Sequence, residues 1–251
     1  APHLRDHCYT VVKRSGLLIP LQYADDICWL GMNCRHSLDN VKKKIPGMIE
    51  QRNLMINNGK TEEYQIRRDG DGAWKKCKYL GTLLDTENDI RRRKGIANEA
   101  MKKIRDISKD RQLDIDIKIR AFNAYASSIF LYNSETWTVN KGTSKAIDSY
   151  HRRMMRNAIN VRWPQEISSE DLYETTKQRP WSETIKTRRM RMFGHIMRLP
   201  EETPIRTALT EYERQMRMSR GARKFTWQQN IKEDLASIGL NREAANQDGD
   251  G

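Results

Sequence analysis

Apolar and polar positions change their period once along the chain. From Leu17 to Leu84 short apolar runs alternate with polar turns, a pattern that predicts short strands and one helix. From Asp89 to about Ile238 apolar residues recur every three or four positions, which predicts a succession of helices. The pattern therefore predicts an α+β chain whose two halves meet near Asp85 to Asp89.

The first half opens with two β-suited runs, Leu17 to Gln22 and Ile27 to Leu30. A compact polar turn, Tyr23-Ala24-Asp25-Asp26, separates them, so the pattern predicts a β-hairpin. One helical face then runs from Leu38 to Ile49, and Pro46 is expected to bend that helix. A strand is expected from Leu54 to Asn57, followed by a turn at Asn58-Gly59. A further strand is expected from Tyr64 to Arg67, and a loop then leads into residues 77–84.

Helices with recognisable stops fill the second half. A stripe of apolar residues runs from Ile90 to Ile107, and the cations at positions 91–94 fall largely off it. The segment from Ile117 to Leu131 is apolar or small on most faces, so it is expected to be the buried helix of a bundle. The other expected helices cover Ile147 to Val161, Trp181 to Leu199, Ile205 to Met216 and Trp227 to Ile238.

The chain is strongly basic, because its 251 residues include 46 Lys and Arg against 33 Asp and Glu, a formal net charge of +13. A charge of this sign favours a polyanionic partner such as nucleic acid. The charged residues are spread along the chain and apolar residues recur between them, which indicates amphipathic helices and not disorder.

Several classes of protein are excluded by short-range features. The apolar stretch from Leu17 to Leu21 is far below the roughly 20 residues that span a bilayer, so no membrane segment is predicted. The first residues lack the apolar core of a secretory signal. Four irregularly spaced cysteines are too few for a disulfide framework. We therefore expect an intracellular protein of the nucleus or cytoplasm, with reduced thiols and no membrane partner.

The turn Tyr23-Ala24-Asp25-Asp26 has the most definite chemical content. Phosphoryl transfer from a nucleotide uses two Mg²⁺ ions about 3.5–4 Å apart, and adjacent carboxylates on a tight turn concentrate the oxygen ligands that Mg²⁺ prefers. Asp25 and Asp26 are therefore candidate metal ligands. Consecutive aspartates also suit an ordinary exposed hairpin turn, so this alternative stays open on the tetrapeptide alone.

Further motifs follow this turn in a definite order. Residues 57–62 (NNGKTE) and 78–84 (KYLGTLL) come after the predicted helix, and residues 132–138 (YNSETWT), 182–191 (SETIKTRRMR), 193–198 (FGHIMR) and 225–235 (FTWQQNIKEDL) come farther on. Over roughly residues 17–240 the order resembles the late palm, thumb and post-thumb regions of the reverse transcriptases of non-LTR (LINE-like) retrotransposons. The resemblance implies a partial palm over residues 1–86, a helical thumb over 87–163, and basic post-thumb helices with a flexible C-terminal tail over 164–251.

The resemblance assigns roles in the palm. Asp25 and Asp26 correspond to the catalytic aspartates that bind Mg²⁺, and Tyr23 corresponds to a residue beside the incoming nucleotide. In the family a further catalytic aspartate comes from a strand well upstream of this turn, yet only 22 residues precede Tyr23. Asp6, the sole acidic residue among them, stands in a context unlike that strand. We therefore expect an incomplete metal site in a fragment of a larger polyprotein whose N-terminal part is missing.

The resemblance also implies contacts with the substrates. Lys60 corresponds to a basic residue near the leaving pyrophosphate, although it could equally be a solvated turn lysine. Tyr79 and Gly81 correspond to the primer-grip hairpin, where a glycine allows close approach to the primer strand. The implied partners are an RNA template with a DNA primer, or an RNA–DNA hybrid.

Two groups of cations in the basic helical half suit nucleic-acid binding, because Lys and Arg displace counterions from a phosphate backbone. Each could instead be a solvated helix residue. The tryptophans at 137, 163, 181 and 227 could stack on bases, although such residues more often anchor helix packing. The nucleic-acid-binding candidates are Arg152, Arg153, Arg156, Lys186, Arg188, Arg189 and Arg191.

The expected function is that of a fragment of an RNA-directed DNA polymerase, inactive alone because one catalytic aspartate is missing. A non-catalytic remnant that still binds nucleic acid is one alternative. The other is a basic helical interaction module without polymerase ancestry. Polymerase ancestry predicts that a longer upstream reading frame encodes another aspartate-bearing strand, whereas the interaction module does not.

Overall fold

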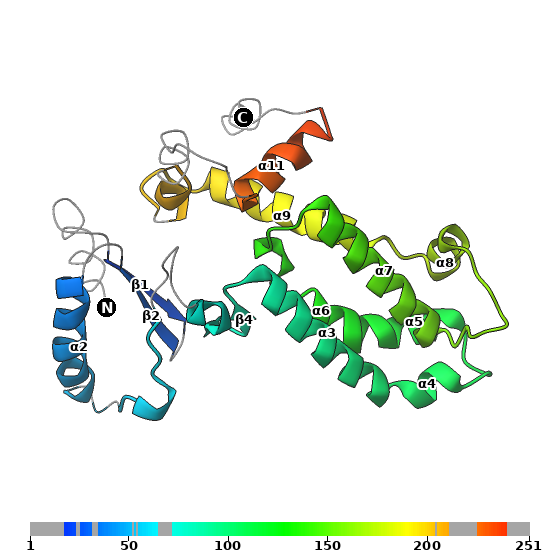
Figure 1. The fold of residues 1–251 in the computed structure, drawn as a ribbon, viewed down its shortest axis with the longest axis horizontal. Coiled ribbons are helices and arrows are strands. Elements are labelled where there is room, and N and C mark those ends of the chain that lie inside the picture. The colour runs from blue at the N-terminus through cyan, green and yellow to red at the C-terminus, as the bar shows by residue number, and fades with distance from the viewer. Residues whose placement is uncertain are drawn as a thin grey trace. The chain divides into compact units, whose positions relative to one another are not determined.

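The computed structural model describes residues 18–23, 26–31, 35–51, 53, 55–64, 72–203, 205–210 and 225–239. The chain divides into two compact units, residues 1–85 and 86–251, within the predicted boundary region. Helices and short antiparallel strands are both present, so the α+β class is confirmed (Figure 1). None of the helices in these ranges combines the length and apolar character that a membrane crossing needs.

The predicted N-terminal hairpin is present. Strand β1 (Leu18–Tyr23) pairs antiparallel with β2 (Asp26–Gly31), and the register runs from Leu18 opposite Gly31 to Tyr23 opposite Asp26. Helix α2 (Arg35–Glu50) follows, with Pro46 inside it. Tyr23 and Asp26 are therefore the last pair of this hairpin, and they are the first and last residues of the tetrapeptide 23–26, which we call the aspartate turn.

The strand predicted over Leu54 to Asn57 is wrong. Residues 55–57 belong to no strand, and Asn58–Lys60 form a short 3-10 turn, η2. The Asn57 carbonyl accepts hydrogen bonds from the Lys60 N–H (3.0 Å) and from Thr61 Oγ1 (3.0 Å), so local contacts satisfy this backbone without a strand partner. Of the strand predicted over Tyr64 to Arg67, Tyr64 lies outside any strand and residues 65–67 lie outside the described residues.

A second hairpin precedes the unit boundary. A short turn, η3 (Ala73–Lys76), leads into β3 (Lys78–Tyr79), which pairs antiparallel with β4 (Thr82–Leu83). Leu80 and Gly81 connect the strands with φ values of 46° and 78°. Two successive left-handed residues define the turn type whose twist matches a tight hairpin, and glycine accepts this backbone region without steric cost.

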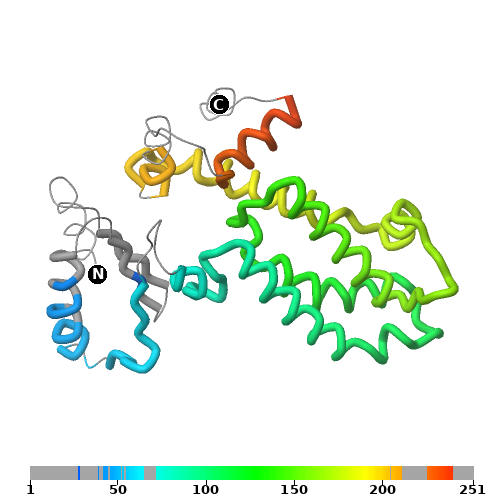
Figure 2. The backbone as a smooth tube through the Cα atoms, in the orientation of Figure 1, coloured from blue at the N-terminus to red at the C-terminus, as the bar shows by residue number. Residues whose placement is uncertain are grey.

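The second unit is helical, and Figure 2 follows its backbone from α3 to α11. The sequence predicts most of these helices, but α8 is not among the predictions. Residues 205–210 are helical, and the rest of the helix predicted to Met216 lies outside the described residues. The helices are α3 (Thr86–Lys103), α4 (Arg105–Lys109), α5 (Ile115–Phe122), α6 (Ser128–Phe130), α7 (Lys141–Ala158), α8 (Ser169–Thr176), α9 (Trp181–Arg198) and α11 (Trp227–Ala236).

The segment predicted as one buried helix over Ile117 to Leu131 is divided. A π-helical turn, η4 (Asn123–Ser127), separates α5 from α6. The expected burial is present nevertheless, because Phe122, Ala126 and Phe130 are fully buried. Their spacing of four residues keeps all three on the face that packs against α3 and α7.

Two hydrophobic clusters stabilise this unit. The larger one joins α3, α5, α6 and α7 to Leu172 of α8 and to Trp181 and Ile185 of α9. Residues on both sides of position 164, where the post-thumb helices are expected to begin, therefore share one core. The smaller cluster joins Phe193 of α9 to the helical residues 205–210 and to α11. Helix α9 contributes to both clusters.

Candidate functional site

The aspartate turn is positioned by the β1–β2 hairpin. Tyr23 ends β1 and Asp26 begins β2, so the backbone pairs these two residues, whereas Asp25 lies outside the described residues. Adjacent carboxylates offer oxygen donors only, and this donor set fits Mg²⁺ chemically. Within the described part of the chain no group of three or more His, Cys, Asp or Glu residues could hold a metal ion.

The other predicted palm residues lie on short turns of the first unit. Lys60 is the last residue of η2 and its side chain is exposed. Tyr79 is half-buried in β3, and Gly81 occupies the left-handed position of the following turn. The structure thus places Tyr79 and Gly81 on one hairpin.

The cations of α7 have different surroundings. The Arg156 guanidinium donates to the Ile167 carbonyl (3.1 Å), which fastens the following loop to the helix. Arg152 is half-buried. Arg153 is exposed, and its guanidinium lies 5.3 Å from the centre of the Tyr150 ring. Arg153 is therefore the cation of this group that solvent reaches most freely.

Lys94 is a cation that the sequence did not single out as a nucleic-acid contact. It lies where α3 contacts α7, which we call the α3–α7 seam. Lys94 of α3 places its ammonium 5.2 Å from the centre of the same Tyr150 ring. Burial, followed by the positive charge of Arg153, lowers the Lys94 pKa below its usual range. The Tyr150 hydroxyl donates to the Lys94 carbonyl (3.1 Å), so the ring holds α3 against α7. Two cations from different helices thus converge on one aromatic ring, an arrangement that favours an anionic ligand.

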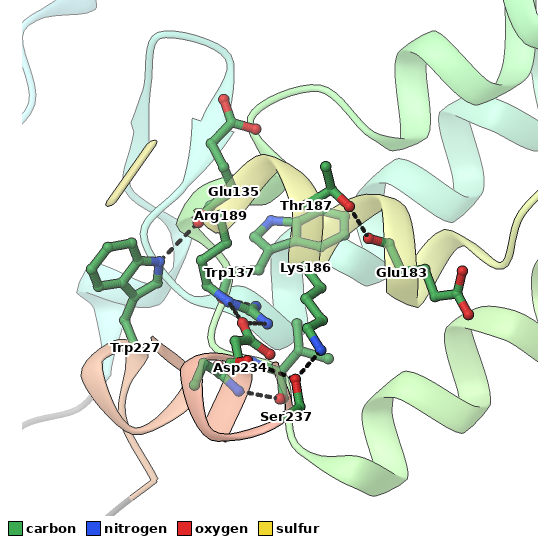
Figure 3. A network of polar contacts seen from close by, with 11 residues as sticks. Glu135, Trp137, Glu183, Lys186, Thr187, Arg189, Trp227, Asp234 and Ser237 are labelled. Carbon is green, nitrogen blue, oxygen red and sulfur yellow. Dashed lines mark hydrogen bonds and ion pairs between the residues drawn. The ribbon is translucent and has the colours of Figure 1, made fainter. Parts of the chain in front are cut away.

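The cations of α9 contact mostly protein groups (Figure 3). Arg189 is only 4% exposed and forms an ion pair with Asp234 of α11, in which Nε and Nη2 lie 2.8 and 2.7 Å from the same carboxylate oxygen, Oδ2. Lys186 donates to the Ser237 hydroxyl, and Arg188 donates to the Leu131 carbonyl. Arg191 is exposed. The sequence predicted phosphate contacts for all four, whereas the guanidinium of Arg189 is occupied inside the protein.

Asn230 and Trp227 complete this network on α11. The Asn230 side chain accepts from the Val139 N–H (2.8 Å) and donates to the Val139 carbonyl (2.7 Å), as a neighbouring strand would. The Trp227 indole donates to the Glu135 carbonyl (2.8 Å; Figure 3). We call these contacts, with the Arg189–Asp234 pair, the α9–α11 clamp. The sequence motifs at 132–138, 182–191 and 225–235 meet there.

A second buried ion pair lies on α3. Asp89 is fully buried and accepts from Arg93 Nε (2.8 Å) and from Trp137 Nε1 (3.0 Å). The apolar spacing predicts that the cations at positions 91–94 lie largely off the stripe. For Arg93 this is wrong, because Arg93 is 4% exposed. Arg93 stands three residues after Ile90 and four before Ala97, so the helical spacing itself places it on that stripe.

The tryptophans divide into packed and exposed side chains. Trp137 and Trp181 are almost fully buried, and the Trp181 indole donates to Ser127 Oγ (3.0 Å). Trp227 is half-buried in the clamp. Trp163 is 88% exposed. Helix packing therefore accounts for the first three, and Trp163 alone of the four keeps the geometry for stacking on a base.

His151 of α7 is a buried titratable group. Its ring stacks on Trp181 at a centroid distance of 4.3 Å, and Phe122 stacks on it at 5.9 Å. Neither ring nitrogen has a hydrogen-bond partner in the described structure. Burial, reinforced by the charge of Arg152, lowers the His151 pKa to about 3, so the imidazole is neutral at physiological pH.

Comparisons with protein-family models, with curated proteins and with solved structures found no match to this chain. The fold and the candidate site define a class by geometry alone. It is a basic α+β chain in which the two ends of the aspartate turn, Tyr23 and Asp26, form the last pair of an antiparallel hairpin. In its helical unit, separate sequence motifs form one clamp.

Proposed function

We propose that this chain carries the late palm and the thumb of an RNA-directed DNA polymerase of the non-LTR retrotransposon type. The position of the aspartate turn carries the proposal, because Tyr23 and Asp26 form the last pair of an antiparallel hairpin. Helix α2, the β3–β4 hairpin and a basic helical unit then follow in the order that the resemblance requires.

In this proposal Asp25 and Asp26 hold Mg²⁺. The bound ion would orient the triphosphate and stabilise the charge of the leaving group. Tyr23 lies beside the incoming nucleotide, and the exposed ammonium of Lys60 stabilises the pyrophosphate. Tyr79 and Gly81 present the turn of their hairpin to the primer strand.

The helical unit binds the RNA–DNA hybrid through its phosphates. Lys94 and Arg153 are the best supported contacts, because they converge on the Tyr150 ring and neither forms an ion pair with a carboxylate among the residues described. Burial is the main cause of the lowered Lys94 pKa, and a phosphate placed between the two cations would relieve the second cause, the repulsion from Arg153. Arg152 on α7 and Arg191 on α9 are further candidate contacts.

Hybrid binding tests the thumb assignment. Affinity for an RNA–DNA hybrid should fall with rising salt, with each neutralised phosphate contributing about 0.7–0.9 to the logarithmic slope. The double variant Lys94→Gln/Arg153→Gln should bind more weakly and lose up to about 2 units of that slope. The matched control Lys43→Gln/Lys44→Gln removes two exposed charges from α2. Equal losses in both variants would show that net charge alone drives binding.

Primer extension tests the palm assignment. The 251-residue chain should not extend a DNA primer on an RNA template. A polypeptide that adds an upstream palm segment with a further aspartate should extend it, and Asp25→Ala or Asp26→Ala should reduce the rate by several orders of magnitude while hybrid binding is retained. Primer extension that persists in Asp25→Ala would show that these carboxylates do not take part in catalysis.

A non-catalytic remnant is the second candidate, and it shares the binding surface of the first. The exposed Arg153 and the half-buried Lys94 support nucleic-acid binding in either case. The two candidates differ only in the extension assay. Salt-dependent hybrid binding, together with an extended polypeptide that never extends a primer, would favour the remnant.

A further inference from the structure

Trp163 is an exposed aromatic side chain. It belongs to the segment that connects α7 to α8, whose backbone Figure 1 shows. At 88% exposure it differs from Trp137 and Trp181, which are buried in the main core. Burial of an indole stabilises a folded protein more than burial of most other side chains, and Trp163 does not contribute this stabilisation here. The side chain is therefore available to a partner.

The backbone around Trp163 is held by hydrogen bonds at both ends. The Val161 N–H donates to the Arg156 carbonyl (2.9 Å), and the Arg156 guanidinium in turn donates to the Ile167 carbonyl (3.1 Å). Within the loop the Gln165 N–H donates to the Arg162 carbonyl (2.8 Å), which closes a turn around the tryptophan. A ring presented by an ordered turn loses little conformational entropy on binding.

The charge beside the ring indicates what the partner is. Arg162 precedes Trp163 and is exposed, and its Nε donates to Asn160 Oδ1 (3.2 Å), which orients the guanidinium. Glu166 is the acidic side chain of the loop. An exposed indole next to an oriented guanidinium, in a chain of net charge +13, suits a polyanion that carries aromatic faces.

We propose that Trp163 is a stacking platform for a base of single-stranded nucleic acid, with Arg162 bound to the adjacent phosphate. Bases in a duplex are stacked on their neighbours, whereas a single strand offers a free face. The platform therefore engages a strand outside the RNA–DNA hybrid. The inference rests on the proposed nucleic-acid function of the helical unit and adds to it a separate, single-strand site.

The test compares two ligands by fluorescence anisotropy, a single-stranded RNA of about 12 nucleotides and an RNA–DNA hybrid. Trp163→Ala should lower the single-strand affinity about 10-fold, since this is the effect of losing one stacked base. Hybrid affinity should be unchanged. Trp163→Phe should retain most of the single-strand affinity because it keeps an aromatic face. Arg162→Gln should reduce the single-strand salt slope by about 1.

The outcomes separate this inference from the proposed function. If Trp163→Ala binds single-stranded RNA like the unchanged chain, while hybrid binding remains salt-dependent, the stacking platform alone is wrong. If the unchanged chain binds neither ligand, the proposed function fails as well. Sedimentation gives a further outcome: if Trp163→Ala abolishes self-association and leaves RNA affinity unchanged, the exposed ring joins two copies of the chain, and the stacking proposal is overturned. Thermal melting followed by circular dichroism controls for folding.

Discussion

Helices α7 and α9 carry similar clusters of cations but use them differently. On α9 the charged groups of Lys186, Arg188 and Arg189 all bond to protein groups, and they join this helix to other segments. On α7 the Arg153 guanidinium lies in solvent over a tyrosine ring. The comparison teaches that the density of positive charge along a helix does not identify a nucleic-acid surface.

The position of each cation relative to the apolar stripe explains the difference. Trp181, Ile185, Phe193 and Ile196 are buried on one face of α9, and Arg189 stands four residues after Ile185 on that face. A charge on the buried face needs a buried partner, which Asp234 supplies. Arg153 instead adjoins the buried Met154 and falls on the exposed side of its helix.

Breaking the buried pair of α9 should have the largest effect. Arg189→Met leaves the Asp234 carboxylate buried without its cation, and we expect a loss of about 3–5 kcal/mol in the free energy of unfolding. Urea denaturation followed by circular dichroism measures it. The matched control Arg191→Met, at an exposed position on the same helix, should change stability by less than about 0.5 kcal/mol.

A double variant sharpens this prediction. Arg189→Met/Asp234→Leu removes both charges, so it should recover most of the stability lost in Arg189→Met. If the double variant is no more stable than the single one, the loss comes from packing and not from an unpaired charge.

The buried histidine of α7 predicts a dependence on pH. His151 has a folded-state pKa of about 3, below its ordinary value near 6.5, so unfolding takes up a proton between these values. Stability should therefore fall as pH falls, with His151 contributing about 1.4 kcal/mol per pH unit between about pH 4 and pH 6. His151→Phe should remove this contribution.

Urea unfolding at several pH values measures the slope for the unchanged chain and for His151→Phe. The ring of phenylalanine retains the stacking on Trp181, so the change isolates protonation from packing. Equal slopes in the unchanged chain and in His151→Phe would mean that the imidazole acquires a proton, or a water partner, within the folded state.

Helix α7 also stabilises the start of α9. Pro180 supplies no side-chain cap, and Asp148 of α7 accepts instead from the Ser182 N–H (2.9 Å) and the Ser182 hydroxyl (2.6 Å). Asp148→Ala should cost about 1 kcal/mol, the usual effect of losing such a cap. Asp148→Asn, which keeps one oxygen acceptor, should cost less. A loss of the same size in both variants would contradict capping by the side-chain oxygen.

The smallest effects on stability are expected at the exposed cations. Arg153→Gln and Arg191→Gln should each change the free energy of unfolding by less than about 0.5 kcal/mol. Each should reduce the salt slope of hybrid binding by about 1 if the exposed faces of both helices contact phosphates. A change at Arg153 alone would restrict the nucleic-acid surface to the α3–α7 seam.

Local patterns predicted much of the fold. The β1–β2 hairpin follows from two β-suited runs around a polar turn, and helices α3, α7 and α9 follow from apolar spacing. The π-helical turn at Asn123–Ser127 has no such local signal, because the apolar stripe of the segment continues through it. The prediction of a strand over Leu54 to Asn57 was wrong, because local hydrogen bonds to the Asn57 carbonyl take the place of strand pairing.

The candidate site was predictable only in part. The sequence located the aspartate turn, the β3–β4 turn and the basic character of the helical half. It missed Lys94, because the ring that this lysine shares with Arg153 belongs to a helix more than fifty residues away. It also treated the exposed Trp163 like the buried Trp137, since identical side chains give no local sign of their burial.

The sequence by itself determined the period of each element, the positions of the turns and the excess of positive charge, because these depend on neighbouring residues and on composition. Only the tertiary structure decided which cations have a partner inside the protein. Arg189 and Arg191 are two residues apart, yet one is buried against Asp234 and the other is exposed, since two positions along a helix differ by more than half a turn. The partner of a buried charge can lie far away in the sequence, so the packing of the helices determines it.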